Sequence, residues 1–304
     1  MSSNAESALL AIAAAVLFAL AATLWQRATL SLDEVSFKKP KSFLLLLLSW
    51  VWLAGLVAQG IAVGLQAAAL DRGPLALVQP LLVTTIVFAL PLGYFLTEQT
   101  VTRRHVLGAF VVVVGLALYG VYGDPAQGVN DAPNNEWLAA FIILGGLCWA
   151  LLLFANRGGP STRAAVYGTV AGVLYGLSAT LMNSVVEAVH SEGWDVLTDW
   201  QLYALGATGI GGFLVQQISL SYGKLATSVS TTSVVNPVIS IILGVLLFQE
   251  TLDDDPSWHR LVAIAGLALA LIGTAVITSA SEKAAKEEEP EAPPEGLPAE
   301  ASAA

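Results

Sequence analysis

The chain has 304 residues, of which 56% are hydrophobic and only 12% are charged. Soluble domains carry about 25% charged residues, so this composition excludes an ordinary soluble protein and indicates a membrane protein. The net charge is −10, and residues 281–304 hold seven Glu and two Lys among Pro and Ala. Such a segment buries too little apolar surface to fold, and we expect a disordered acidic tail there.

Nine apolar runs follow one another along the chain, and each is long enough for a membrane-crossing helix, which needs about 20 residues. They cover about 7–29, 43–70, 75–97, 104–122, 136–156, 163–188, 200–222, 225–249 and 259–280. The strands of a membrane barrel read instead as alternating segments of about ten residues, and the sequence has none. We therefore predict an all-α polytopic membrane protein with nine transmembrane helices.

The first four predicted helices resemble the last four. VLFALAATL at 16–24 returns as VLYGLSATL at 173–181, with six of the nine positions identical. Further matches in the same order pair Gln66, Gly73, Leu75, Ala76, Glu98, Gly108 and Gly115 with Gln216, Gly223, Leu225, Ala226, Glu250, Gly266 and Gly273. Helices 1–4 then correspond to helices 6–9, and the odd number of crossings between matched helices predicts an inverted repeat.

This repeat predicts four segments. Residues 1–123 form the first membrane repeat, and residues 124–156 form an outer loop with the connecting helix 5. Residues 157–280 form the second, inverted repeat, and residues 281–304 form a cytoplasmic tail. With the N-terminus outside, only Arg72 and Arg260 of the 13 Lys and Arg residues lie on the outer side. The positive-inside rule therefore predicts an outside N-terminus and a cytoplasmic C-terminus in a multi-pass protein of the plasma (inner) membrane.

Two stretches of the second half carry a family resemblance. STTSVVNPVISIILGVLLFQETL at 230–252, followed by LVAIAGLALALIGTAVI at 261–277, resembles the closing helices of the EamA-like drug/metabolite transporter superfamily. In the first half, Pro80 and Glu98 are farther apart than Pro237 and Glu250, and this longer spacing is similar to that of the NIPA-like magnesium transporters. The resemblance implies inverted repeats, secondary transport by alternating access and, for the superfamily, export.

Polar side chains and prolines inside the spans are the candidates for a substrate path. Pro80 and Pro237 remove backbone donors, so each is expected to break or kink its helix. Polar side chains within membrane helices face protein or water, where they join helices or line a cavity. The candidates for such a shared cavity are Gln66, Gln79, Asn183, Gln216 and Asn236.

Glu98 and Glu250 close the third and eighth predicted helices, on opposite faces of the membrane. Arg103 and Arg104 follow the first of these carboxylates, and Arg260 follows the second. We predict a structural ion pair at the gate end of each repeat, with proton coupling as the alternative.

The sequence argues against an enzyme, because it holds no metalloprotease, P-loop or nucleophile-elbow motif. No cofactor and no bound metal are expected, and no nucleic acid is expected as a partner. The leading interpretation is a secondary transporter that exports a small organic solute. The alternative is a transporter of magnesium or another divalent cation, and the third is a non-transporting membrane scaffold. The expected partners are the substrate and the lipid bilayer. A homodimer with a second copy of the chain is a further possible arrangement.

Overall fold

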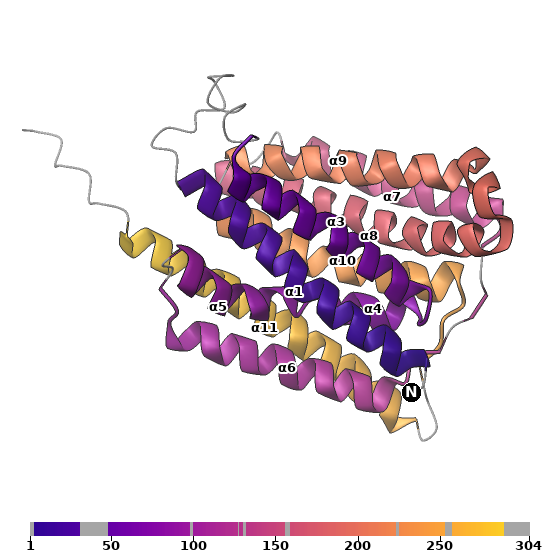
Figure 1. The fold of residues 1–304 in the computed structure, drawn as a ribbon, viewed down its shortest axis with the longest axis horizontal. Coiled ribbons are helices and arrows are strands. Elements are labelled where there is room, and N and C mark those ends of the chain that lie inside the picture. The colour runs from indigo at the N-terminus through magenta and orange to yellow at the C-terminus, as the bar shows by residue number, and fades with distance from the viewer. Residues whose placement is uncertain are drawn as a thin grey trace, which may run out of the picture.

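The computed structural model describes residues 3–30, 48–97, 100–126, 128–129, 132–155, 159–222, 225–252 and 257–288. These residues form a bundle of helices that run side by side along the long axis of Figure 1. The first half contributes α1 (Ser3–Leu30), α3 (Trp50–Leu70), α4 (Leu75–Leu82), α5 (Thr85–Thr97) and α6 (Arg103–Gly123). The remainder contributes α7 (Asn134–Ala155), α8 (Pro160–Glu192), the short 3-10 helix η1 (Gly193–Thr198), α9 (Trp200–Tyr222), α10 (Leu225–Leu247) and α11 (Trp258–Glu288).

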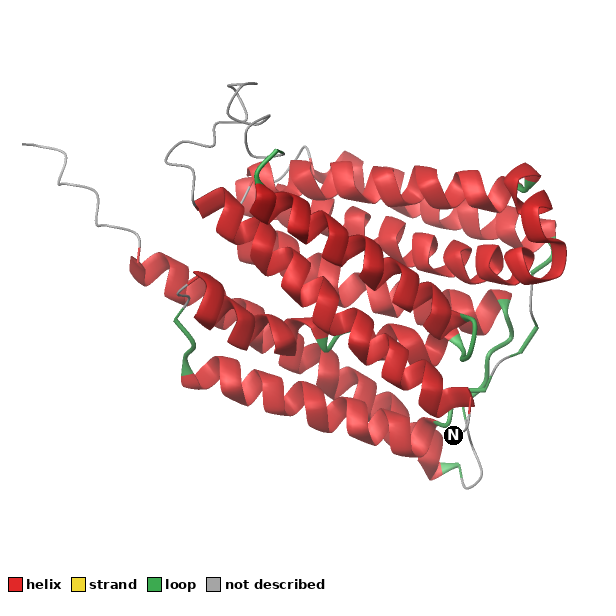
Figure 2. Ribbon diagram, in the orientation of Figure 1, coloured by secondary structure: helices red, strands yellow, loops and turns green. Residues whose placement is uncertain are grey.

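The described residues contain helices and no strand, as Figure 2 shows, so the all-α prediction is confirmed for them. Seven of the spans are long and apolar enough to cross a membrane: α1, α3, the α4–α5 pair, α6, α7, α8 and α11. In α10 the apolar stretch Thr231–Leu247 is shorter, and α9 is not among the seven. The chain is therefore a multi-pass membrane protein, and the number nine stays a prediction.

The third span is two helices. α4 ends at Leu82 and α5 begins at Thr85, and the hydroxyl of Thr84 donates to the carbonyl of Leu81 at 2.6 Å in the break. We expected the break at Pro80, but Pro80 lies inside α4 and the interruption follows it. Pro237 lies within α10, which continues as one helix on both sides of the proline.

The helices of the two predicted repeats have similar packing partners. α1 packs against α3, α4 and α5, and α8 packs against α9 and α10. The matched helices α6 and α11 pack against each other through glycine. A Cβ on Gly108 would lie 2.9 Å from the carbonyl oxygen of Gly273, and a Cβ on Gly115 would lie 2.5 Å from that of Gly266. The predicted repeat pairs Gly108 with Gly266 and Gly115 with Gly273, so each of these contacts joins one glycine to the predicted counterpart of the other.

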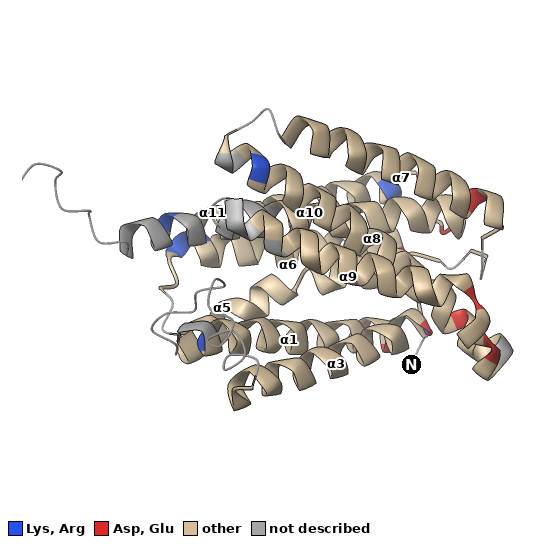
Figure 3. Ribbon diagram, turned by 90° about the horizontal axis from the view of Figure 1, so that it is seen from above, with Lys and Arg blue, Asp and Glu red and all other residues tan. Residues whose placement is uncertain are grey.

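Charged residues gather largely at the two ends of the bundle, with the acidic ones at one end and most of the basic ones at the other, as the colours of the ribbon in Figure 3 show. We call the end near the N-terminus the acidic end, because Asp71, Glu187 and Glu250 line one pocket there and Asp124 lines a second cavity with Glu250. Most of the described Lys and Arg residues lie at the other end. This separation agrees with the charge asymmetry of the sequence, whereas which end faces the cell exterior stays a prediction. At the C-terminus, α11 continues to Glu288, and residues 289–304 of the predicted tail lie outside the described residues.

Candidate functional site

Glu250 is a buried carboxylate at the acidic end of the bundle. It follows α10 by three residues, and only 4% of it is exposed. The chain turns back at this point because the amides of Phe248 and Glu250 both donate to the carbonyl of Gly244, at 3.1 and 3.2 Å. Gln249 takes the left-handed conformation in the turn, with φ of 54°. The turn directs the Glu250 side chain into the bundle.

The carboxylate of Glu250 caps the N-terminus of α4. Its two oxygens accept the backbone amides of Leu75 at 2.6 Å and Ala76 at 2.8 Å. The first amides of a helix have no partner within the helix, and Pro74 before α4 supplies no side-chain cap. The aligned peptide dipoles also make this helix end partly positive, so an anion there is stabilising.

Tyr119 of α6 also forms a hydrogen bond with the first turn of α4. Its hydroxyl donates to the carbonyl of Ala76 at 2.6 Å. In a regular helix this carbonyl would accept the amide of residue 80, but Pro80 has no amide hydrogen. Tyr119 therefore satisfies the acceptor that the proline leaves open. Both backbone groups of Ala76 thus depend on side chains from outside α4.

Burial opposes the charge of Glu250, whereas its contacts with α4 favour it. Burial raises the pKa of Glu250 to about 6, and the amide hydrogen bonds from Ala76 and Leu75 offset part of that rise. Gly244 permits the close approach, because a Cβ there would lie 2.6 Å from Oε2 of Glu250. The carboxylate is therefore tightly enclosed beside α4 and protonates more easily than an exposed glutamate.

A small polar pocket opens beside Glu250. Its volume is about 140 Å³, and its side-chain oxygens come from Asp71, Asn183, Glu187 and Glu250. Asn183 and Glu187 are one turn apart on α8, and Asp71 follows α3 directly. At the rim, Nδ1 of His190 lies 3.0 Å from Asp71, and Nη1 of Arg72 lies 3.4 Å from it. The pocket concentrates oxygen atoms and negative charge at one end of the bundle.

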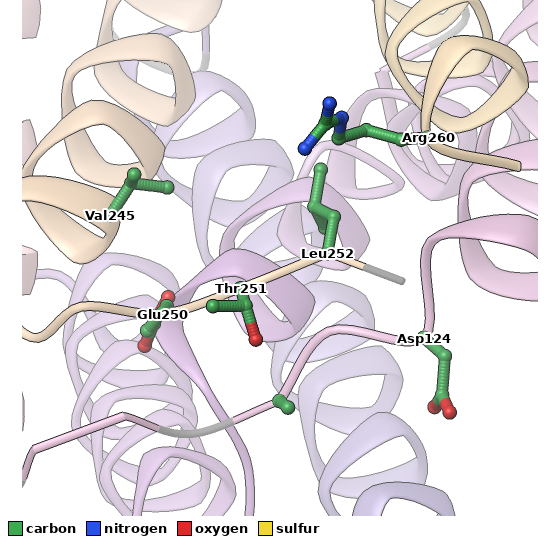
Figure 4. Close-up of a pocket in the computed structure, with 7 residues that line it drawn as sticks. Asp124, Val245, Glu250, Thr251, Leu252 and Arg260 are labelled. Carbon is green, nitrogen blue, oxygen red and sulfur yellow. The ribbon is translucent and has the colours of Figure 1, made fainter. Parts of the chain in front are cut away.

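A larger and more open cavity of about 690 Å³ lies on another side of Glu250. Figure 4 shows its lining, with Glu250 on the side of α10 and with Asp124 and Arg260 across from it. Among the residues that the structure describes, Glu250 alone lines both this cavity and the polar pocket. Across the described part of the chain, no group of three or more His, Cys, Asp or Glu residues is arranged to hold a metal ion.

The structure brings together some of the polar residues that the sequence singled out. Asn183 and Glu250 line one pocket. Gln66 is buried, and Gln79 is buried with its Nε2 lacking a hydrogen-bond partner. Farther along, Gln216 accepts the hydroxyl of Thr232 at 2.5 Å, and the hydroxyl of Ser240 donates to the carbonyl of Asn236 at 2.9 Å. A single cavity shared by all five predicted residues stays a prediction.

The predictions made for Glu98 and Glu250, the two gate-end glutamates, have different outcomes. Glu98 lies outside the described residues. For Glu250 we predicted an ion pair, and the partners that the structure shows are two backbone amides. Asp71 and Glu187 also line the pocket, and neither was among the predicted site residues. Glu187 could have been found, because Asn183 and Glu187 are four residues apart and share a helix face.

Most of the chain matches a known protein family. The family described as Magnesium transporter NIPA matches residues 3–286. A protein of Corynebacterium glutamicum, described only as uncharacterized, is 28% identical over 251 residues, which are 82% of this chain and 87% of that protein. No solved structure matches the chain. The NIPA-like resemblance predicted for the first half thus extends over nearly the whole chain.

Proposed function

Because the chain belongs to the NIPA family of magnesium transporters, we propose that it carries Mg²⁺ or a related divalent cation across the plasma membrane. The family is one of membrane transporters and not of enzymes. The family match over residues 3–286 is the observation that carries the substrate class. It favours the cation alternative over the export of an organic solute, which was the leading interpretation of the sequence.

The polar pocket at the acidic end supports a cation as the substrate. Mg²⁺ binds oxygen ligands, keeps several of its waters and needs only one or two carboxylates from the protein. The pocket offers the carboxylates of Glu187 and Asp71 and the amide of Asn183. The negative charge at this end also raises the local concentration of cations.

The arrangement of the helices supports alternating access. Inverted repeats exchange conformations about a central axis and open a site to each side in turn. The contacts of α6 with α11, in which Gly108 meets Gly273 and Gly115 meets Gly266, fit such an axis. We propose nine spans in two inverted units, with the N-terminus outside and the C-terminus in the cytoplasm.

One observation favours a second candidate. The cavity of about 690 Å³ falls within the range of about 300–1,000 Å³ that is common for small-molecule sites. Its lining includes Arg260 and Asp124, which present a positive and a negative group to an organic solute. Export of a small organic solute therefore remains the alternative to cation transport.

Binding of Mn²⁺ as a paramagnetic substitute for Mg²⁺ tests the proposal. Purified protein in detergent should lower the free Mn²⁺ signal in electron paramagnetic resonance, and Mg²⁺ should restore it. Glu187→Gln should weaken this binding about tenfold or more, because it removes one of the few carboxylates of the pocket. Asp195→Asn is the matched control, since Asp195 lies on η1 at the same end and is exposed. Equal Mn²⁺ affinity in wild type, Glu187→Gln and Asp195→Asn would place the site elsewhere.

A further inference from the structure

Glu250 ties the second half of the chain to α4, the separate first part of a broken span. We infer that this contact is a latch: Glu250 leaves the α4 amides to bind the substrate cation, so that cation entry and movement of α4 are one event. The inference rests on the proposed function, and it adds to it the group that couples binding to a change of conformation.

The cation and the α4 amides compete for the same carboxylate. The N-terminus of α4 is partly positive, so it repels a cation placed against the carboxylate that caps it. Glu250 is also enclosed, with 4% exposure and with Gly244 directly behind Oε2. In this position both carboxylate oxygens are held by the amides of Leu75 and Ala76. To bind a cation beside Asn183 and Glu187, the carboxylate has to turn away from these amides toward the polar pocket, which it already lines.

α4 is built to respond when Glu250 leaves. It is eight residues long, and the break after Leu82 separates it from α5. Without Glu250, the amides of Leu75 and Ala76 have no acceptor while they are buried. Unpartnered buried amides are costly, so release favours a conformation in which water reaches them. The expected movement exposes the first turn of α4 toward the acidic end, while Tyr119 still holds the carbonyl of Ala76.

Chemical modification of a buried cysteine measures this opening. In a Cys148→Ala background, Ala76→Cys places a thiol in the first turn of α4, where residue 76 is 1% exposed. Leu77→Cys is a second reporter, because it removes volume and does not crowd the core. Ala62→Cys on α3 reports general loosening of the bundle, since residue 62 is 0% exposed and does not line either cavity. The probe is a membrane-impermeant maleimide.

Two results are expected. Without Mg²⁺, Glu250→Ala should raise the modification rate of the α4 reporters about tenfold, which corresponds to the usual cost of losing a helix cap. The modification rate of the cysteine at residue 62 should stay unchanged. In the protein that retains Glu250, millimolar Mg²⁺ should raise the α4 rates, and in Glu250→Ala it should have no further effect.

Two results would overturn the latch. One is an α4 modification rate that Glu250→Ala leaves unchanged. The other is an α4 rate that does not respond to Mg²⁺ at concentrations that compete for Mn²⁺ binding, which would leave the proposed function intact. An absence of Mn²⁺ binding would instead overturn the proposed function. The effect of Glu250→Ala on the α4 reporters is measured without Mg²⁺, so it tests the contact between Glu250 and α4 whether or not the protein binds a cation.

Discussion

Replacing Tyr119 with phenylalanine tests whether its hydroxyl satisfies the carbonyl that Pro80 leaves open. The hydroxyl donates to the carbonyl of Ala76 at 2.6 Å, and Tyr119 is 2% exposed. A buried acceptor that loses its donor costs about 1–3 kcal/mol, and hydrogen bonds between membrane helices average about 0.6 kcal/mol. We therefore expect Tyr119→Phe to lower the free energy of unfolding by about 1 kcal/mol.

A double-mutant cycle with Pro80→Ala isolates this effect. Alanine at position 80 has an amide that can bond to the carbonyl of Ala76 within α4. In that background Tyr119→Phe should cost less than about 0.5 kcal/mol, because the acceptor has a second donor. The measurement is reversible unfolding by dodecyl sulfate in mixed micelles, followed by circular dichroism. Tyr122→Phe on the same helix is the control, because its ring contacts with Trp258 and His259 remain. Equal costs of Tyr119→Phe in both backgrounds would refute the reasoning.

Three further predictions follow from the helix contacts, the buried carboxylate and the charge pattern. Gly115→Ala should destabilise the protein by about 1–3 kcal/mol, because its Cβ meets backbone atoms of α11 at 2.5 Å, whereas Gly120→Ala on the same helix has open space and should be neutral or stabilising. The raised pKa of Glu250 means that the folded protein binds this proton more tightly than the unfolded chain does. The free energy of unfolding should therefore fall by up to about 2 kcal/mol as the pH rises from about 4.5 through about 6. Glu250→Gln should remove this part of the pH dependence. A cysteine at Ser3 should react with an impermeant reagent applied to intact cells, and reaction only after lysis would reverse the proposed orientation.

The sequence was sufficient for the coarse architecture of the membrane region. Composition and the lengths of the apolar runs predicted the class, because a bilayer admits few other backbone structures. Each long observed helix covers most of one predicted run, and α1, α8 and α11 extend beyond theirs. The position of the break in the third span was less predictable. Pro80 removes one hydrogen bond, but Tyr119 replaces it, so the helix continues through the proline and ends two residues later.

The partner of Glu250 could not be read from the sequence. Its two donors are 174 and 175 residues away along the chain, and they are backbone groups that carry no residue signature. The residue type alone favoured an ion pair with a nearby arginine. The pocket was partly predictable, because Asn183 and Glu187 share a helix face, whereas Asp71 joins them only through the packing of α3 against α8.

Flux of Mg²⁺ into vesicles that contain only this protein tests the central claim most directly. Purified protein in liposomes with an entrapped Mg²⁺-sensitive dye should give saturable Mg²⁺ uptake down an imposed gradient, and protein-free liposomes should give none. Glu187→Gln should raise the Mg²⁺ concentration for half-maximal flux, and Asp195→Asn should leave it unchanged. Uptake equal to that of protein-free liposomes, from protein that retains its folded structure and exchanges a labelled organic solute, would contradict cation transport.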